Sequence, residues 1–164
     1  MELIGTINAT NRETFYLSTQ IKNWELKLPK KNWLAFLIND EDNTEALMHQ
    51  FVSTCKTKNV LHIKMYQKEI AQKQIEIGIE NIIKNNVDFL QPYLELLHVE
   101  KYENIDHGFW EITNVSEVDF TAKLTDGYIV VCLDCKNSSS KTELLDLINR
   151  FNDGWVPIVK TNYL

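Results

Sequence analysis

The sequence predicts an α/β fold in one domain: a three-layer sandwich with a mixed, mostly parallel central sheet and an N-terminal antiparallel hairpin. Two segments, Trp33–Ile38 and Tyr128–Leu133, are apolar throughout, which is typical of strands covered by helices on both faces. Each is followed by apolar residues at helical spacing, the order expected of a parallel sheet. At 164 residues the chain has the length of one ordinary domain, so we expect residues 1–164 to form a single domain.

The N-terminal part of the chain has the pattern of short antiparallel strands. Glu2–Ile7 and Thr14–Ser18 alternate in part and flank Asn8–Arg12, a turn-forming stretch that predicts a hairpin or two edge strands. Trp24–Leu28 alternates cleanly, which places every second side chain on one face: Trp24, Leu26 and Leu28. Pro29 then ends this segment.

The first buried strand begins a predicted βαβ unit. After the acidic stretch 40–45, apolar side chains recur at helical spacing: Leu47, Met48, Phe51, Val52 and Cys55. Asp42 and Glu45 stand three apart, as in a capping box with Asp in place of Ser or Thr. Val60–Ile63 then restarts a short strand, and the crossover between the two strands is expected to be right-handed.

The middle of the chain has less regular patterns. Gln67–Asn85 begins as a polar helix although its centre alternates with the period of a strand, and we predict a helix there. Val87–Val99 carries leucines at helical spacing and predicts a helix that starts near Pro92. The patterns of His107–Thr113 and Val115–Leu124 yield no assignment.

A helix and a final strand are predicted after the second buried strand. Ser140 and Glu143 match a capping box, and apolar residues follow at helical spacing: Leu144, Leu145, Leu147, Ile148 and Phe151. Gly154 is suited to the C-terminal cap of this helix, because glycine readily adopts left-handed backbone angles. Trp155–Val159 predicts a last strand, and its Pro157 places it at an edge or an end of the sheet.

Charge and cysteine content exclude several classes of protein. A formal net charge of −6 argues against nucleic-acid binding, which depends on Lys and Arg to release counterions, and favours a basic partner. The apolar runs are far shorter than the roughly 20 residues that span a bilayer, and residues 1–6 lack the pattern of a secretory signal. Three cysteines fit a reducing compartment. We therefore expect a cytoplasmic protein that contacts neither membrane nor nucleic acid, with its oligomeric state left open.

The sharpest chemical pattern is Asp40–Thr44, which reads D-x-D-x-T soon after a buried strand. It resembles the nucleophile motif of haloacid-dehalogenase-type phosphatases, which implies that Asp40 attacks phosphorus, Asp42 handles the leaving-group proton and Mg²⁺ neutralises charge. Asp134 ends another buried strand and Lys160 follows the last one, so a magnesium ligand and a phosphate contact can be nominated, as in receiver domains. The motif departs from the phosphatase pattern because an asparagine precedes it and later paired acids are missing. The alternative is that these acids cap a helix, whose N-terminus stabilises negative charge.

The remaining reactive residues show no complete catalytic or metal-binding signature. Cys132 and Cys135 have C-x-x-C spacing, but Cys132 falls within a predicted strand and no second pair completes a zinc site, so buried thiols are expected. The histidines also lack the spacing of ligand motifs: His49, His62, His98 and His107. No cofactor and no metal is therefore expected.

A family resemblance rests on three segments: Asn32–Ile38, Val60–Ile63 and Asn152–Pro157. Together they resemble an uncharacterised family of small bacterial α/β domains, over about half the chain and most closely in its last third. The resemblance implies a fold and no particular activity. Small acidic bacterial domains without catalytic motifs are also similar in type to immunity proteins that neutralise a basic toxin.

The leading hypothesis is a non-enzymatic protein-binding domain, with an immunity or antitoxin-like factor as its specific form. It is motivated by the acidic balance of the chain and by the incomplete catalytic patterns. The candidate contact residues are Asp40, Glu41, Asp42 and Trp110. Trp110 is included because tryptophan is enriched at interface hot spots, although burial in the core would account for it equally well.

The alternative hypothesis is a Mg²⁺-dependent phospho-aspartyl enzyme or a degenerate receiver-like domain. It would use the strand-end carboxylates and one lysine: Asp40, Asp42, Asp134 and Lys160. A third hypothesis, a small-molecule sensor, rests only on the rule that open α/β sheets bind ligands at the carboxyl ends of their strands.

Overall fold

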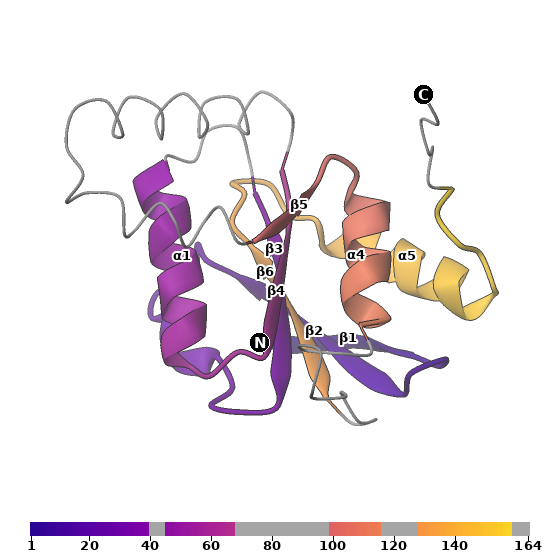
Figure 1. Cartoon of the computed structure of the whole chain (residues 1–164), viewed down its shortest axis with the longest axis horizontal. Coiled ribbons are helices and arrows are strands. Elements are labelled where there is room, and N and C mark those ends of the chain that lie inside the picture. The colour runs from indigo at the N-terminus through magenta and orange to yellow at the C-terminus, as the bar shows by residue number, and fades with distance from the viewer. Residues whose placement is uncertain (40–44, 68–98, 116–127, 159–164) are drawn as a thin grey trace.

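The computed structural model describes residues 1–39, 45–67, 99–115 and 128–158. Within these residues one sheet has the strand order β1-β2-β6-β3-β4-β5 (Figure 1). The strands are β1 Glu2–Ile7, β2 Arg12–Ser18, β3 Trp33–Ile38, β4 His62–Tyr66, β5 Glu100–Tyr102 and β6 Ile129–Asp134. β1 is antiparallel to β2, and every other neighbouring pair in this order is parallel. The predicted mixed sheet with an N-terminal hairpin is confirmed.

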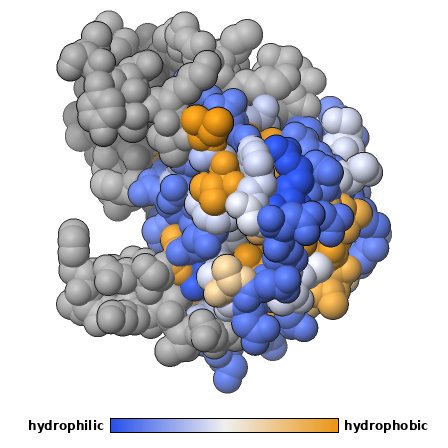
Figure 2. Space-filling view, turned by 90° about the vertical axis from the view of Figure 1, so that its right-hand side faces the viewer, coloured by the Kyte–Doolittle hydropathy of each residue, from blue (hydrophilic) through white to orange (hydrophobic). Residues whose placement is uncertain are grey.

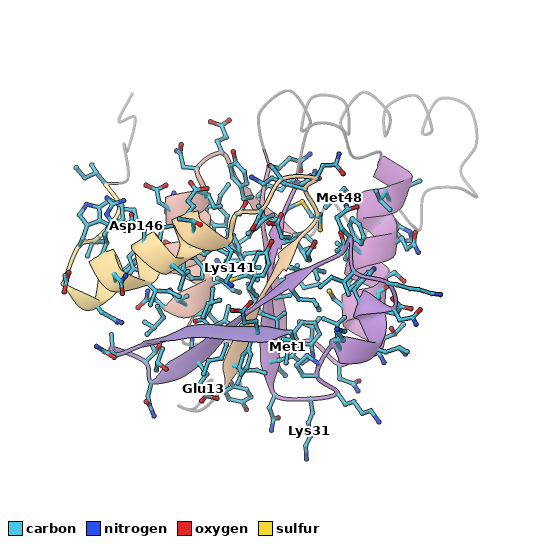
Figure 3. The ribbon with its side chains drawn as sticks, turned by 180° about the vertical axis from the view of Figure 1, so that it is seen from behind. Met1, Glu13, Lys31, Met48, Lys141 and Asp146 are labelled. Atoms are coloured by element: carbon cyan, nitrogen blue, oxygen red, sulfur yellow. The ribbon has the colours of Figure 1, made fainter. Side chains whose placement is uncertain are left out.

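Helices cover both faces of the sheet. Among the described residues, α1, Glu45–Thr57, covers one face, and α4, Ile105–Thr113, and α5, Lys141–Asn152, cover the other. Figure 3 shows the same layers from behind, with Met48 of α1 and Asp146 of α5 on opposite sides of the strands. The predicted three-layer sandwich is therefore confirmed. No helix among the described residues is long and apolar enough to cross a membrane.

The central strands explain why both faces are covered. All six residues of β3 are fully buried, and their side chains alternate between two hydrophobic cores. Leu37 of β3 and Leu133 of β6 pack beneath α1, whereas Phe36 and Cys132 pack beneath α4 and α5. Burial of each large apolar side chain contributes about 1.5–3 kcal/mol, so a strand that is apolar at every position is stable only between two layers of helix.

The predicted βαβ unit is present. β3 and β4 are parallel, with Leu34 opposite His62, and α1 connects them. The apolar face predicted for this helix is buried at Met48, Val52 and Cys55. α5 likewise buries the predicted apolar positions Leu144, Leu147, Ile148 and Phe151. Gly154 has a φ of 90°, and its amide donates to the carbonyl of Phe151 at 3.0 Å, as expected of a residue that ends a helix.

The alternating segment after β2 forms a 3-10 helix, η1, over Trp24–Lys27. Asn23 before it has the left-handed φ of 58°, which turns the chain so that the alternation no longer maps onto one face. Trp24 packs edge-on against Phe51 with ring centroids 5.6 Å apart. Leu26, which the alternation places beside Trp24, is 71% exposed. The prediction of a shared face was wrong because it assumed an extended backbone.

The segment after α5 is not a strand over its described residues, Trp155–Ile158. The amide of Trp155 donates to the carbonyl of Arg150 at 2.9 Å, and its ring stacks on Phe151 with the two planes 3° apart. The Arg150 guanidinium lies 3.7 Å from the centroid of the Trp155 ring. These contacts hold the chain against α5 instead of at the edge of the sheet.

In the described part of the middle of the chain, where the sequence pattern is irregular, the structure shows β5 and α4. β5 has three residues, and α4 covers His107–Thr113, which had no assignment. Gly108 lets α4 approach the sheet closely: a Cβ atom there would lie 2.9 Å from Cε2 of Phe36. The helices predicted within residues 68–98 lie outside the described residues, as do Asp42 and most of Val115–Leu124.

Candidate functional site

The carboxyl ends of the parallel strands meet at one edge of the sheet. The chain leaves β3 toward α1 on one face and leaves neighbouring β6 toward α5 on the other (Figure 1). Such a reversal is where open α/β sheets bind ligands. Of the predicted catalytic residues, Asp134 lies at this edge, at the end of β6. Asp40, Asp42 and Lys160 lie outside the described residues.

Asp134 is fully buried and accepts three hydrogen bonds. Its Oδ2 accepts from the Tyr16 hydroxyl at 2.8 Å and from the Ser140 amide at 2.8 Å. Its Oδ1 accepts from the Lys136 amide at 3.1 Å. The carboxylate thus joins the middle of β2, the loop after β6 and the start of α5.

The capping box predicted at Ser140 is wrong. The Ser140 side chain makes no capping hydrogen bond, and its own amide is taken by Asp134 from six residues earlier. Ser139 contributes the next bond, since its Oγ accepts from the Lys141 amide at 3.2 Å. A buried carboxylate binds helix N-terminal amides more strongly than a neutral hydroxyl does. Its negative charge lies at the positive end of the helix dipole, and hydrogen bonds to a charged acceptor are stronger.

Tyr16 completes this group from β2. Its hydroxyl lies 3.2 Å from Oγ of Ser139 as well as 2.8 Å from Asp134. Burial, together with the negative charge of Asp134, raises the pKa of Tyr16 to about 12, so the phenol keeps its proton at neutral pH. Donation from a neutral phenol to a buried carboxylate is the pattern of a structural contact.

A second polar cluster, which sequence reasoning missed, lies between β4, β5 and α4. We call it the Lys64 cluster: Lys64, Glu100, Tyr102 and Glu111. The Lys64 side chain is only 6% exposed. Its ammonium donates to the Glu100 carboxylate and, at 2.8 Å, to the Tyr102 hydroxyl, and it lies 3.9 Å from Glu111 of α4. The Tyr102 hydroxyl in turn donates to Glu100 at 2.8 Å.

The electrostatics of the Lys64 cluster keep its charges paired. Hydrogen bonds from Lys64 and Tyr102 lower the pKa of Glu100. Burial and the neighbouring Glu100 raise the pKa of Tyr102. Nearby on β4, burial and the charge of Lys64 lower the pKa of His62. The alternation of His62, Lys64 and Tyr66 with apolar residues indicates a strand with one polar face. The partners of Lys64 could not be predicted, because they come from segments with no predicted structure.

All three cysteines are buried thiols, as expected for Cys132 and Cys135. Burial raises the pKa of Cys55 to about 12. Burial also raises the pKa of Cys132 and of Cys135 well above the usual range. The thiolate is the reactive form of cysteine, so these side chains have the environment of inert core residues.

Two further predicted features can be placed. Trp110 is half-buried, and its ring packs edge-on against Phe151 at 5.0 Å, so much of it already belongs to the core beneath α4 and α5. Over residues 1–39, 45–67, 99–115 and 128–158, no group of three or more histidine, cysteine or acidic side chains is arranged to hold a metal ion. His98 lies outside those ranges.

The fold and its polar edge define an open α/β protein with a mixed sheet. Comparison of the chain with protein families, curated proteins and solved structures gives no match. The resemblance to a family of small bacterial domains therefore stays a prediction, and the function has to be argued from the side chains themselves.

Proposed function

We propose that the chain is a non-enzymatic protein-binding domain of the cytoplasm, with an immunity or antitoxin-like factor as its specific form. Its partner is a basic protein, which a chain of net charge −6 attracts over long range. The acidic stretch Asp40–Asp42 is the proposed centre of contact. This proposed binding role does not involve phosphoryl transfer.

The burial and the hydrogen bonds of Asp134 support this proposal most. A carboxylate that binds Mg²⁺ or accepts a phosphoryl group must be reached by its ligand. Asp134 is fully buried, and three internal donors occupy its two oxygens. The acid that the phospho-aspartyl alternative requires at the end of β6 thus serves as a structural anchor.

We take the surface on the side of α4 and α5 as lying outside the proposed contact. Figure 2 shows this side as mainly hydrophilic, with hydrophobic residues in separate patches. Two exposed apolar side chains follow α5: Val156 is 51% exposed and Ile158 is 88% exposed. Non-obligate interfaces are about as apolar as the rest of the surface, so these exposed apolar side chains do not by themselves mark an interface.

The experiment is an affinity capture with the purified full chain, followed by a measured affinity for each captured protein. Neutralising the acidic stretch by Asp40→Asn, Glu41→Gln and Asp42→Asn should weaken binding at least about tenfold, because close charge pairs couple strongly. Added salt should slow association in the wild type and have less effect in this variant.

The matched control removes the same number of charges from α5 and the residue after it: Glu143→Gln, Asp146→Asn and Asp153→Asn. These side chains belong to exposed positions, and the control should bind within about threefold of the wild type. Equal weakening by both variants would mean attraction by net charge alone. Capture of no basic protein would contradict the proposal.

A further inference from the structure

The carboxyl ends of β3 and β4 carry two buried carboxamide side chains, Asn39 and Gln67. The parallel ladder continues one residue beyond each strand. The amide of Asn39 donates to the carbonyl of Tyr66 at 3.0 Å, and the amide of Gln67 donates to that of Tyr102 at 2.9 Å. Since Ile38 is the register partner of Tyr66, the two carboxamides stand at the same level of neighbouring strands.

Both side chains belong on the face that α1 covers. Side chains alternate along a strand, and Leu37 and Met65, two residues earlier, lie in the core beneath α1. Cys135, the residue after β6, belongs to the same core, and its amide donates to the carbonyl of Ile38, the last residue of β3, at 2.9 Å. We call Cys135, Asn39 and Gln67 the carboxyl-end row. On this face of the sheet, the row follows directly after the apolar side chains of Leu37 and Met65.

Gln67 is the unusual member of this row. It is fully buried, yet neither polar atom of its carboxamide has a hydrogen-bond partner in the structure as described. An unmade hydrogen bond leaves the dehydration of a buried polar group uncompensated, so most such groups are paired. Methionine or leucine would fill a buried position without this cost. A side chain that costs stability in the unliganded protein is typical of a binding site.

The position of the row favours the same interpretation. Its residues directly follow β6, β3 and β4, where the chain leaves β3 and β6 toward opposite faces. Ligands of open α/β sheets bind at the carboxyl ends of strands beside such a reversal. The burial of Gln67 and the topology of the sheet are independent observations, and both indicate this edge.

We propose that the carboxyl-end row binds a small uncharged molecule with an amide-like edge, in which a hydrogen-bond donor stands beside an acceptor. Gln67 has the matching edge, because its Nε2 donates and its Oε1 accepts. Glutamine and asparagine pair with adenine through this same arrangement. Asn39 adds a second carboxamide, and Cys135 is a neutral thiol because burial raises its pKa. A charged ligand would be buried here without a counter-charge in the row.

The test uses adenosine and nicotinamide as probes on the full chain. Binding is measured by thermal shift and by ligand-observed NMR, with N6,N6-dimethyladenosine as the analogue that lacks the donor. Adenosine or nicotinamide should raise the Tm of the wild type in proportion to its occupancy, and the dimethyl analogue should not. Because Gln67 is fully buried, binding needs an opening of the structure, and association should be slower than diffusion.

Gln67→Met separates binding from folding. Without ligand, this variant should have a Tm equal to or above that of the wild type, while its affinity for the probe falls about tenfold or more, as expected for the loss of a two-bond pair. Gln20→Met changes an exposed glutamine and should alter neither quantity. The proposal is overturned if neither probe binds the wild type, if Gln67→Met binds as well as the wild type, or if Gln67→Met lowers the Tm by several degrees.

Discussion

Asp134 shows how one residue acquires a role that its position alone does not define. As the last residue of a buried strand it is a candidate for metal or phosphoryl chemistry. Its hydrogen-bond partners instead give it a structural role. Tyr16 lies 118 residues earlier in the chain, and the Ser140 amide lies at the start of a helix. Each donor is buried or partly buried. Its hydrogen bond to the carboxylate therefore offsets the free-energy cost of removing that donor from water.

Replacing Asp134 should therefore destabilise the fold. Asp134→Ala removes three hydrogen bonds to a charged acceptor, and we expect the free energy of unfolding to fall by roughly 2–4 kcal/mol. Urea denaturation followed by tryptophan fluorescence measures it. Asp146→Ala, on the exposed face of α5, should change stability by less than about 0.5 kcal/mol. An Asp134→Ala protein as stable as the wild type would show that the anchor is not structural.

His62 should make stability depend on pH. Its pKa in the folded protein is lowered by burial and by Lys64, with Glu100 opposing, so the unfolded chain binds the proton more readily. The contribution is fully present above the unfolded pKa of about 6.5 and is lost as pH falls through the folded value. Stability measured from about pH 7 to about pH 5 should fall more steeply in the wild type than in His62→Gln.

NMR titration provides a direct check of the same group. The His62 ring signals should titrate below the value of 6.5 that is usual for histidine. Glu100 also has a lowered pKa, but its window begins near the usual carboxyl range of about 4.3, so the two groups are distinguishable. Parallel pH profiles for the wild type and His62→Gln would argue against the perturbed histidine.

At the scale of elements, α4 depends on the absence of a side chain. A Cβ atom on Gly108 would lie 2.9 Å from Phe36 and 3.1 Å from Tyr102. Glycine weakens a helix by roughly 0.8–1 kcal/mol relative to alanine, and here the close approach of α4 to β3 and β5 compensates for it.

Gly108→Ala should consequently destabilise the protein although alanine is the better helix former. Overpacking typically costs about 1–3 kcal/mol, which exceeds the gain in helix propensity. Asn149→Ala on α5 is the matched control, because this exposed position should gain up to roughly 0.7 kcal/mol from propensity alone. Chemical denaturation of both variants decides the question. If both are stabilised, α4 has room for a methyl group.

Elements with strong periodicity could be predicted from sequence, and those held by distant partners could not. β3, β6, α1 and α5 each bury a regular apolar pattern, and each was predicted. β5 has only three residues, and it is held beside β4 by the contact of Glu100 and Tyr102 with Lys64. The capping of α5 was misassigned for a related reason, since its acceptor, Asp134, lies outside the local sequence window of a capping box.

The candidate site was predictable only in outline. Asp134 was nominated from its likeness to the strand-end acids of receiver domains, and the structure places it at the end of β6, at the carboxyl edge of the sheet. Gln67 was not named as a site residue, because a single glutamine after a short strand carries no local signal. Its importance comes from complete burial and from its missing hydrogen bonds, which depend on tertiary packing.

For the whole molecule, the central question is whether the two hydrophobic cores behave as one. The core beneath α1 and the core beneath α4 and α5 are separated by a single layer of strands. Adjacent residues of β3, such as Phe36 and Leu37, belong to different cores. Neither core can lose its packing without exposing the strands that also carry the other, so we expect the two cores to unfold together.

A pair of core substitutions tests this coupling. Met48→Ala on the buried face of α1 should cost about 2–5 kcal/mol, and Ile112→Val on the buried face of α4 about 0.5–1.5 kcal/mol. Because the sheet separates the two sites, the double variant should equal their sum within about 0.5 kcal/mol. Each variant should nevertheless unfold in one transition, with an unchanged denaturant slope, because the two cores share their strands. Far-UV and near-UV circular dichroism should report the same midpoint. Separate midpoints, or a reduced slope in only one variant, would mean that the layers unfold independently and that the chain contains more than one cooperative unit.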